Sequence, residues 1–144
     1  MIALLQRVCE ARVDVSGRCI ASIGQGILAL IGVQAGDNED TAEQFTSRII
    51  NYRLFADDQG KMNLSLLDIK GGLLLVPQFT LAANTRKGRR PSFTSAAPPA
   101  IGESVFQSML DFARNSYARV ESGVFGADMA VHLINDGPVT FILD

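Results

Sequence analysis

The chain has 144 residues, 47% hydrophobic and 19% charged, which is the size and composition of one globular domain spanning residues 1–144. Its 13 Lys and Arg residues against 15 Asp and Glu give a formal net charge of −2. This balance excludes a sequence-blind polyanion binder, which needs a large basic surface, but allows a small basic patch. No apolar run approaches the roughly 20 residues of a membrane-spanning helix. The first residues also lack a basic leader and a cleavage site, so we expect a cytoplasmic protein with no membrane partner.

The N-terminal third predicts a meander of β-strands. Short alternating or apolar runs indicate strands at 2–8, 11–15 and 18–23, the last two joined by a turn at Ser16–Gly17. The run 26–33 is continuously apolar and begins with a glycine, which is typical of a strand buried on both faces.

Both cysteines, Cys9 and Cys19, are expected to be free thiols. If the turn pairs the ends of its two strands, Cys19 lies opposite Asp14 and Cys9 lies opposite Gly24, far from its potential partner. A single His and two Cys do not supply the closely spaced ligands of a zinc-type site. We therefore expect neither a metal nor another cofactor.

Two helices are predicted farther along the chain. Apolar residues at helical spacing indicate one over 39–51, with Asn38 or Asp40 available as its N-cap. A second is predicted from about Glu103 to Arg119. Its inner stripe is expected to consist of Val105, Met109 and Phe112.

The remaining strands complete the prediction of fold class. An apolar strand at 73–76 runs into 77–81, and two C-terminal strands at 128–134 and 139–143 are separated by a turn, Asn135-Asp-Gly-Pro138. The intervening segments are interpreted as turns and loops: 55–70 and 83–100. Strands that do not alternate regularly with two main helices indicate an α+β domain with a largely antiparallel sheet.

A glycine motif and the single histidine could each indicate a functional site, but both are interpreted as structural. Residues 24–29 have the letters of a dinucleotide fingerprint, G-x-G-x-x-A, but that motif needs a helix where this chain predicts a buried strand. His132, the single histidine, alternates with Val131 and Leu133 in a predicted strand, and no nucleophile-elbow motif accompanies it. We interpret it as a structural or surface residue.

A basic cluster stands out against the acidic background. It is interpreted either as a solvated loop or as a phosphate contact, since Arg side chains and the backbone amides near a glycine suit phosphate oxygens. The cluster consists of Arg86, Lys87, Arg89 and Arg90.

Polar residues directly follow the apolar strand at 73–76. Alternation would direct Gln78 and Thr80 to one face and Phe79 to the other, which suits either a turn or a site at the strand end. The later pair Gly137–Pro138 belongs to a predicted turn, and a bond to proline can adopt the cis form at modest cost.

Several motifs in order and spacing are similar to those of one family. They are Gly60-Lys-Met-Asn-Leu64, Pro77-Gln-Phe-Thr-Leu-Ala82, Arg90-Pro-Ser-Phe93, Gly123-Val-Phe-Gly-Ala-Asp-Met129 and Asn135-Asp-Gly-Pro-Val-Thr140. With the opening MIALLQRV, they span essentially the full length. The chain resembles the D-aminoacyl-tRNA deacylases.

The resemblance implies a compact, barrel-like homodimer that hydrolyses the ester joining a D-amino acid, or glycine, to the 3′ adenosine of tRNA. It implies that Gly137–Pro138 is a cis pair that enters the partner's site, where its carbonyls hold the substrate's α-amino group. Gln78, Phe79 and Thr80 would line the ester and the terminal adenosine. Met129 would form the pocket wall near the adenine.

Pro77 departs from the family pattern, which usually has Ser there. The substitution removes a hydroxyl and a backbone N–H from the motif. A sister group has Pro at this position and acts on L-alanine mischarged on tRNA, but Phe79 and the segment 136–140 agree with the D-specific branch. An inactive module that binds the tRNA end is a further alternative.

The mechanism expected from these residues is orientation of an already activated ester with oxyanion stabilisation by amides around Phe79 and Thr80. Gln78 would position the substrate, and the vicinal 2′-OH would help to activate water. Thr80 is either a nucleophile or a positioning residue, and the second role is favoured because no base is evident beside it.

Overall fold

Strand β1 (Ile2–Val15) organises the fold, because it pairs with three other strands. The computed structural model describes residues 1–86 and 88–144. One edge of β1 pairs antiparallel with β3 (Gly26–Gly32) along its first half and with β2 (Arg18–Ile23) along its second half. The predicted runs at the N-terminus are therefore one long strand that bends from one neighbour to the next.

The sheet is mixed and nearly closed into a barrel. The other edge of β1 pairs antiparallel with β8 (Ala130–Leu143), whereas β6 (Gly72–Pro77) runs parallel to both β3 and β7 (Val120–Ser122). The α+β class is confirmed. Among the described residues, three pairings of this sheet are antiparallel and two are parallel, so the sheet is largely antiparallel as predicted but also contains parallel pairs. Strand β7 did not emerge from the pattern because three residues with one half-buried apolar side chain carry little periodicity.

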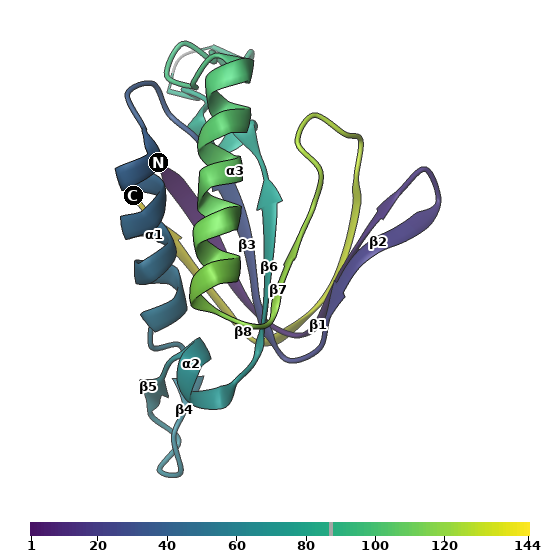
Figure 1. Cartoon of the computed structure of the whole chain (residues 1–144), viewed down its shortest axis with the longest axis vertical. Helices are drawn as coiled ribbons and strands as arrows, with labels where there is room; N and C mark the ends of the chain where they lie inside the picture. Colours follow the sequence, from purple (N-terminus) through teal and green to yellow (C-terminus); the bar gives the residue numbers. More distant parts are fainter. Residues whose placement is uncertain (87) are drawn as a thin grey trace.

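Two long helices cover one face of the sheet, as Figure 1 shows. Helix α1 (Glu39–Asn51) has the predicted bounds, and the Asn38 side chain accepts from the Thr41 N–H at 2.9 Å, so Asn38 is the N-cap. Helix α3 (Pro99–Ser116) begins four residues before the predicted start at Glu103. Proline is tolerated in a first turn, where its missing N–H would have no helical partner.

The inner stripe of α3 differs partly from the prediction. Val105 and Met109 are buried as expected, whereas Phe112 is only half-buried. The other buried positions are Gly102, Phe106, Leu110 and Ala113.

A small unit follows α1, where turns alone were predicted. It contains the hairpin of β4 (Phe55–Ala56) and β5 (Met62–Leu64) and the one-turn helix α2 (Leu66–Ile69). The Ser65 side chain caps α2, and the Ser65 N–H and hydroxyl hold the pKa of the Asp68 carboxyl below its usual value. Elements this short lack a periodic signal.

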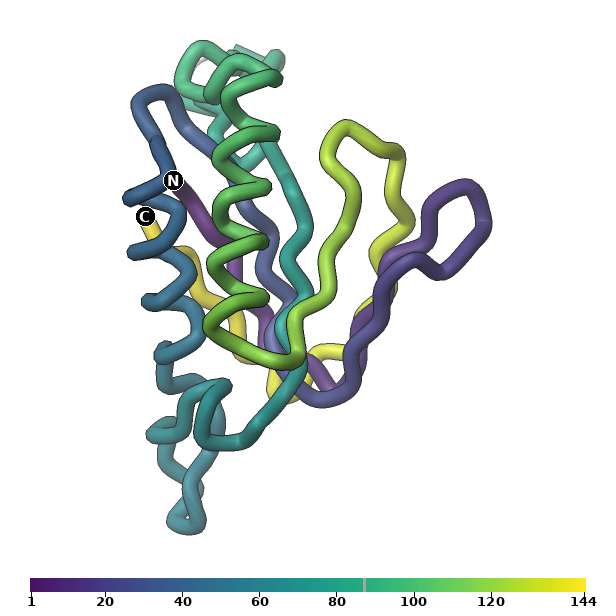
Figure 2. Tube along the Cα trace, in the orientation of Figure 1, coloured from purple at the N-terminus to yellow at the C-terminus, as the bar shows by residue number. Residues whose placement is uncertain are grey.

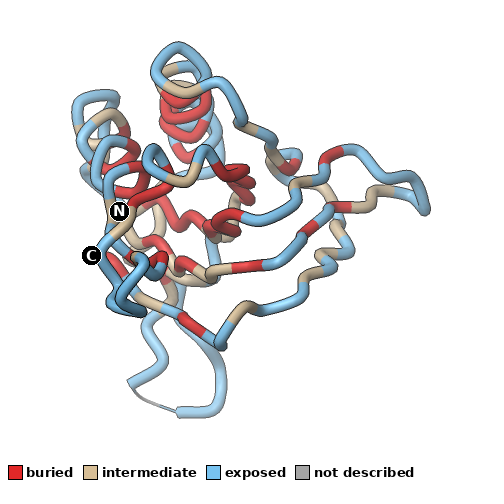
Figure 3. Tube along the Cα trace, turned by 90° about the horizontal axis from the view of Figure 1, so that it is seen from below, coloured by how far each residue is buried: buried red, intermediate tan, exposed pale blue. Residues whose placement is uncertain are grey.

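The core has two parts. Figure 3 shows in red which segments of the trace are buried. The larger lies between the helices and the sheet and includes Leu5, Ile49 and Met109. The smaller lies inside the curved part of the sheet, around Val8 and Leu74. Strand β3 is buried along nearly its whole length, because the two parts pack on its opposite faces.

Strand β8 continues through the segment predicted as a turn. Between the pairs Gln6–Thr140 and Val8–Asn135, β1 has one residue, Arg7, while β8 has the four residues 136–139. The prediction of two strands separated by a turn is therefore wrong. The Gly and Pro residues mark a wide bulge within one strand, which local pattern does not distinguish from a turn.

The two thiols are free and exposed, as predicted. Cys19 lies opposite Asp14, but a bulge between Val13 and Asp14 shifts the rest of the register by one residue. Cys9 is therefore not opposite Gly24. It lies where the pairing of β1 with β8 is also irregular.

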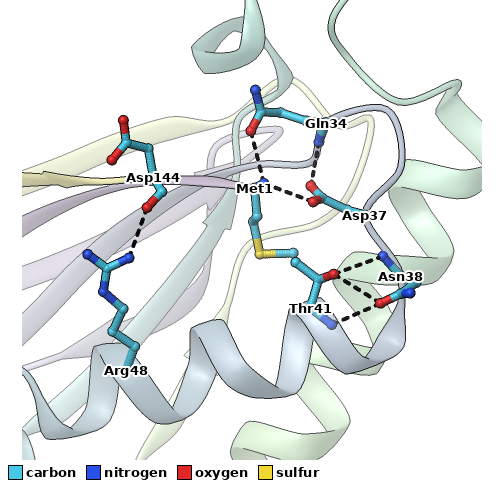
Figure 4. Close-up of polar contacts among 7 residues, drawn as sticks. All are labelled: Met1, Gln34, Asp37, Asn38, Thr41, Arg48 and Asp144. Atoms are coloured by element: carbon cyan, nitrogen blue, oxygen red, sulfur yellow. Dashed lines mark hydrogen bonds and ion pairs between the residues drawn. The ribbon is translucent and has the colours of Figure 1, made fainter.

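Both ends of the chain lie beside α1, as the trace in Figure 2 shows. The Met1 ammonium donates to Gln34 Oε1 and to Asp37 Oδ1, both at 2.9 Å (Figure 4). Arg48 of α1 donates to the Asp144 carbonyl at 3.0 Å. These contacts attach the start of β1 to the loop before α1 and the end of β8 to α1 itself. Among the described residues, no helix is long and apolar enough to cross a membrane.

Tyr117 links α3 to the α2 region. Its hydroxyl donates to the carbonyls of Leu66 and Gly71, and burial raises the pKa of the phenol above 10.0. The Tyr117→Phe variant should lose about 1 kcal/mol of unfolding free energy at pH 7 in urea titrations. Because the folded pKa is raised, this contribution is complete below pH 10 and is lost as pH rises through the folded value. The difference from wild type should therefore shrink at strongly alkaline pH.

Tyr52→Phe is the matched control, since the Tyr52 ring packs edge-on against Phe141. Equal losses in both variants would show that the Tyr117 hydroxyl bonds do not stabilise the fold.

Candidate active site

The chain changes direction where β6 ends. Pro77 is the last residue of β6 and pairs with Ile31 of β3, and the Gln78 N–H donates to the Ile31 carbonyl at 2.7 Å. The chain then enters a 3-10 helix, η1 (Phe79–Ala82). The strand therefore does not continue to residue 81, but it fixes where this turn begins.

Gln78 and Thr80 lie together, but a turn brings them together and not the strand alternation that the prediction assumed. The Gln78 amide Nε2 donates to the Thr80 hydroxyl, and both residues lie at the molecular surface. An amide does not take up a proton, so this partner does not activate Thr80 as a nucleophile.

Two backbone amides are unused at this turn. Among the described residues, the N–H groups of Phe79 and Thr80 have no backbone acceptor, whereas the Leu81 N–H donates to the Gln78 carbonyl at 3.2 Å. The first N–H groups of a helical turn have no partner within it. They are therefore free to bond an external oxygen.

An apolar pocket of about 240 Å³ lies beside this turn. Phe79 and Pro77 form part of its wall, and α3 and the loop after β7 provide Phe106 and Phe125. The other lining residues are Ile31, Val33, Ala97, Pro99, Gly102 and Gly126. A planar ring with apolar faces fits such a lining.

Met129 and Pro77 both lie close to Gly123. Its sulfur accepts from the Val124 N–H at 3.4 Å, and a Cβ added at Gly123 would meet both the Met129 sulfur at 2.7 Å and the Pro77 ring at 3.4 Å. The structure therefore places Met129 near Pro77, the residue that precedes the Gln78–Thr80 turn.

Gly137 and Pro138 lie elsewhere, in the bulge of β8. Their peptide bond is cis, and Gly137 has φ +125°, a conformation that favours glycine. Arg7 holds the segment: its Nε donates to the Asp136 carbonyl at 3.0 Å and pairs with the carboxylate at 3.1 Å, while Nη1 donates to the Leu54 carbonyl at 2.8 Å.

Sequence reasoning missed Arg7. Arg7 is the one charged residue of the predicted strand 2–8, which was the available signal, but its partner Asp136 lies 129 positions away. A side chain added at Gly137 would meet Arg7 Nη2 at 3.0 Å, so the bulge and the guanidinium fit closely.

Within one chain, the Gly137–Pro138 segment lies far from the Gln78–Thr80 turn. Along β3, Ile27 is level with Arg7, whereas Ile31 is level with Pro77, which is about 13 Å farther at the rise of a strand. Three strand spacings, about 14 Å, also separate β8 from β6. The distance exceeds the size of one amino acid.

The predicted basic cluster lies on an exposed loop near η1. Arg86, Arg89 and Arg90 are exposed, and Lys87 lies outside the described residues. Asn84 and Ser92 close this loop with backbone bonds of 2.7 and 3.1 Å.

His132 lies on β8, away from the Gln78–Thr80 turn, and its side chain is half-exposed. This agrees with its interpretation as a structural or surface residue. Its Nε2 is 3.0 Å from Asp14 Oδ2, and Arg12 pairs with the same carboxylate at 3.4 Å. Arg12 lies opposite His132 on the paired strands β1 and β8, and Asp14 follows two residues later on β1. Arg12 and His132 line an open concavity of about 810 Å³. This concavity is larger than the apolar pocket beside η1, but no residue of the Gln78–Thr80 turn lines it. Within the described part of the chain, no His, Cys, Asp and Glu group could hold a metal.

Comparisons with known proteins agree on one family. Residues 4–144 match the family described as D-Tyr-tRNA(Tyr) deacylase. A D-aminoacyl-tRNA deacylase of Pseudomonas aeruginosa (strain LESB58) is 60% identical over 144 residues, covering 100% of this chain and 99% of the relative. The chain belongs to the D-Tyr-tRNA(Tyr) deacylase family, and the resemblance found in the sequence is confirmed.

Solved structures agree on the fold. A c-Myc DNA Unwinding Element Binding Protein superposes with a TM-score of 0.95 at 39% identity, covering 100% of this chain and 98% of the other. A structure described as a probable eukaryotic D-amino acid tRNA deacylase gives 0.84 at 17% identity, covering 99% and 97% of the two chains. At that identity the likeness concerns the fold alone.

Arg7→Met should loosen the bulge and destabilise the protein. It removes charge-assisted bonds to Asp136 and leaves the buried Leu54 carbonyl without its partner, for a loss of about 2 kcal/mol in urea unfolding. Asp136→Asn is the matched control, since it keeps the carbonyl bond and removes only a partly exposed ion pair, for a loss below about 1 kcal/mol. A larger loss in the control would contradict the role assigned to the carbonyl bonds.

Proposed function

We propose that this protein releases a D-amino acid, or glycine, from the 3′ adenosine of tRNA by hydrolysing the ester bond. Membership of the deacylase family and 60% identity over the full chain carry this conclusion. The same identity disfavours the alternatives of an L-alanine-specific deacylase and an inactive tRNA-end binding module. We further propose that residues 1–144 act as one domain in the cytoplasm.

The apolar pocket beside η1 is the proposed site of the terminal adenine. Phe79, Phe106 and Phe125 provide faces on which a purine packs, and Pro77 and Met129 form the adjoining wall. With the base there, the ribose and its ester lie at the mouth of the pocket, next to Gln78 and Thr80.

Oxyanion stabilisation is proposed for the free amides of the turn. The N–H groups of Phe79 and Thr80 are available to the ester oxygen as it gains charge in the tetrahedral state. Gln78 positions the substrate, and its bond to Thr80 fixes the amide. Pro77, which has neither a hydroxyl nor an N–H, serves as wall and not as donor.

The attacking group in this proposal is a water molecule activated with the help of the vicinal 2′-OH of the RNA. The aminoacyl ester is already activated, so a strong protein base is not required. The Thr80 hydroxyl agrees with this, because among the described side chains its hydrogen-bond partner is the Gln78 amide and not a base.

A homodimer is proposed, in which Gly137–Pro138 of each copy enters the other copy's site. The separation of these residues from Gln78 within one chain supports this arrangement. An apolar face on β8 and its neighbours also lacks cover: Ile142 is 66% exposed, and Leu4, paired with both Ile142 and Leu30, is only half-buried. A symmetric pair of copies would bury it.

Chirality is then read by exclusion. The carbonyls of the Gly137–Pro138 segment would hold the α-amino group and leave no room for an L side chain. Arg7 keeps the segment rigid, which an exclusion mechanism requires.

The basic loop is proposed to contact tRNA phosphates weakly. Arg86, Lys87, Arg89 and Arg90 would supply these contacts in an otherwise acidic protein. Binding is thus expected to be limited to the tip of the tRNA.

The proposed reaction predicts strong stereoselectivity. The protein should release D-tyrosine and glycine from charged tRNA at least 100-fold faster than L-tyrosine, because the L side chain collides with the cross-subunit segment. Release is measured with radiolabelled aminoacyl-tRNA, and L-alanyl-tRNA is the control for the sister-group activity. Similar rates for D and L substrates would contradict the assignment.

Thr80→Ala should retain most single-turnover activity on D-tyrosyl-tRNA, within about 10-fold of wild type, because the hydroxyl only helps to position Gln78. Gln78→Ala should cost more, since it removes the positioning amide itself. Complete loss of activity in Thr80→Ala with unchanged tRNA binding would make Thr80 the nucleophile.

A further inference from the structure

Two aromatic rings are exposed beside the proposed adenosine pocket. Phe79 is 56% and Phe93 is 41% exposed, and their ring centroids lie 5.1 Å apart with planes inclined by 50°. Phe79 lines the pocket, whereas Phe93 does not. The pair therefore extends the aromatic surface of the pocket outward. Packing in the core does not account for these two rings, because both are exposed.

Phe93 is held by backbone contacts on both sides. The Asn84–Ser92 bridge lies directly before it, and the Phe93 carbonyl accepts from the Ala96 N–H at 3.0 Å. Ser95 also donates its hydroxyl to the Ala82 carbonyl at 2.7 Å, which attaches this segment to η1. The ring is thus displayed from a fixed support.

The segment of the chain that carries the pair is basic. No Asp or Glu occurs in the sequence between Asp68 and Glu103, while Arg89 and Arg90 are exposed on the loop that ends at Phe93. Phe93 is three positions after Arg90, so their Cα atoms lie within about 11 Å of each other. An exposed aromatic ring beside cations is the combination that binds single-stranded nucleic acid, by base stacking and phosphate contact.

We propose that Phe93 forms a second nucleotide subsite, where the cytosine that precedes the terminal adenosine stacks on its ring. This inference rests on the proposed function, because a substrate whose adenine fills the pocket extends its preceding nucleotide outward. We assign a nucleotide to this subsite for two reasons. The Phe93 ring adjoins the proposed adenine pocket through Phe79, and the nearby arginines suit the phosphate that joins the two nucleotides. Since every mature tRNA ends in CCA, such a subsite adds affinity without selecting among tRNAs.

The test uses substrates of increasing length. D-tyrosine is esterified to adenosine, to the dinucleotide CpA, and to the same dinucleotide with an abasic residue in place of cytidine. The wild-type protein should hydrolyse the CpA ester with a kcat/KM about 10-fold above that of the other two, the gain expected of one stacked base.

Phe93→Ala should reduce the ratio of kcat/KM for the CpA ester to that for the abasic ester to about 1, and Phe93→Tyr should preserve it. Leu67→Ala is the matched control, because Leu67 is an equally exposed apolar residue on α2. Thermal unfolding of each variant verifies folding, and the ratio of two substrates cancels any loss of active protein.

Two outcomes would overturn the subsite. One is equal wild-type hydrolysis of the CpA and abasic esters. The other is a uniform loss on all three substrates in Phe93→Ala, which would make Phe93 a brace for Phe79 alone. Both leave D-tyrosyl-adenosine as a substrate. Failure of the wild-type protein on every ester and on D-tyrosyl-tRNA would instead reject the proposed function, and with it the subsite.

Discussion

The pairing of β1 with β8 is the constraint on which the other parts of the molecule depend. It runs almost the full length of both strands, and the opposite edge of β1 carries β2 and β3 in turn. Arg7 lies at the one place where this pairing opens widely, and its guanidinium bonds to the opened segment and to Leu54 after α1. Sheet, helical layer and Gly137–Pro138 are thus joined through one partly buried cation, whose fork geometry satisfies three oxygens.

Sequence pattern predicts elements that bury a periodic face, and helix α1 and strand β2 have the predicted bounds, whereas α3 begins four residues early. Helix α1 is an example, since Asn38 caps it and Phe45 and Ile49 face the core. The short elements and the parallel pairing of β6 depend on contacts between distant segments, which no local window contains. The bulge at 136–139 has the composition of a turn, and only its pairing with Arg7 distinguishes the two. Among the site residues, Gln78 and Phe79 carried a recognisable motif, whereas Arg7 and Phe93 gain their meaning from neighbours in space.

A net charge of −2 is compatible with the proposed binding of tRNA by the basic loop, because only a small area of the RNA would be contacted. A protein that encloses one nucleotide and touches the next needs aromatic surface and a few cations, not an extended basic face. In the proposed complex with tRNA, the negative net charge of the chain would limit non-specific binding to the rest of the RNA. The acid-free stretch between Asp68 and Glu103 concentrates attraction beside the pocket.

The two irregularities between β1 and β8 compensate for each other. Before the bulge, Gln6 faces Thr140, and after both irregularities Glu10 faces Ile134, so even-numbered positions oppose even-numbered ones on both sides. The odd offset created opposite Arg7 is cancelled by the extra residue at Cys9. A slip of one residue would turn every later side chain to the opposite face of the sheet. Insertions and deletions at 136–139 are therefore compatible with the core only in steps of two, or together with a change of length beside Cys9.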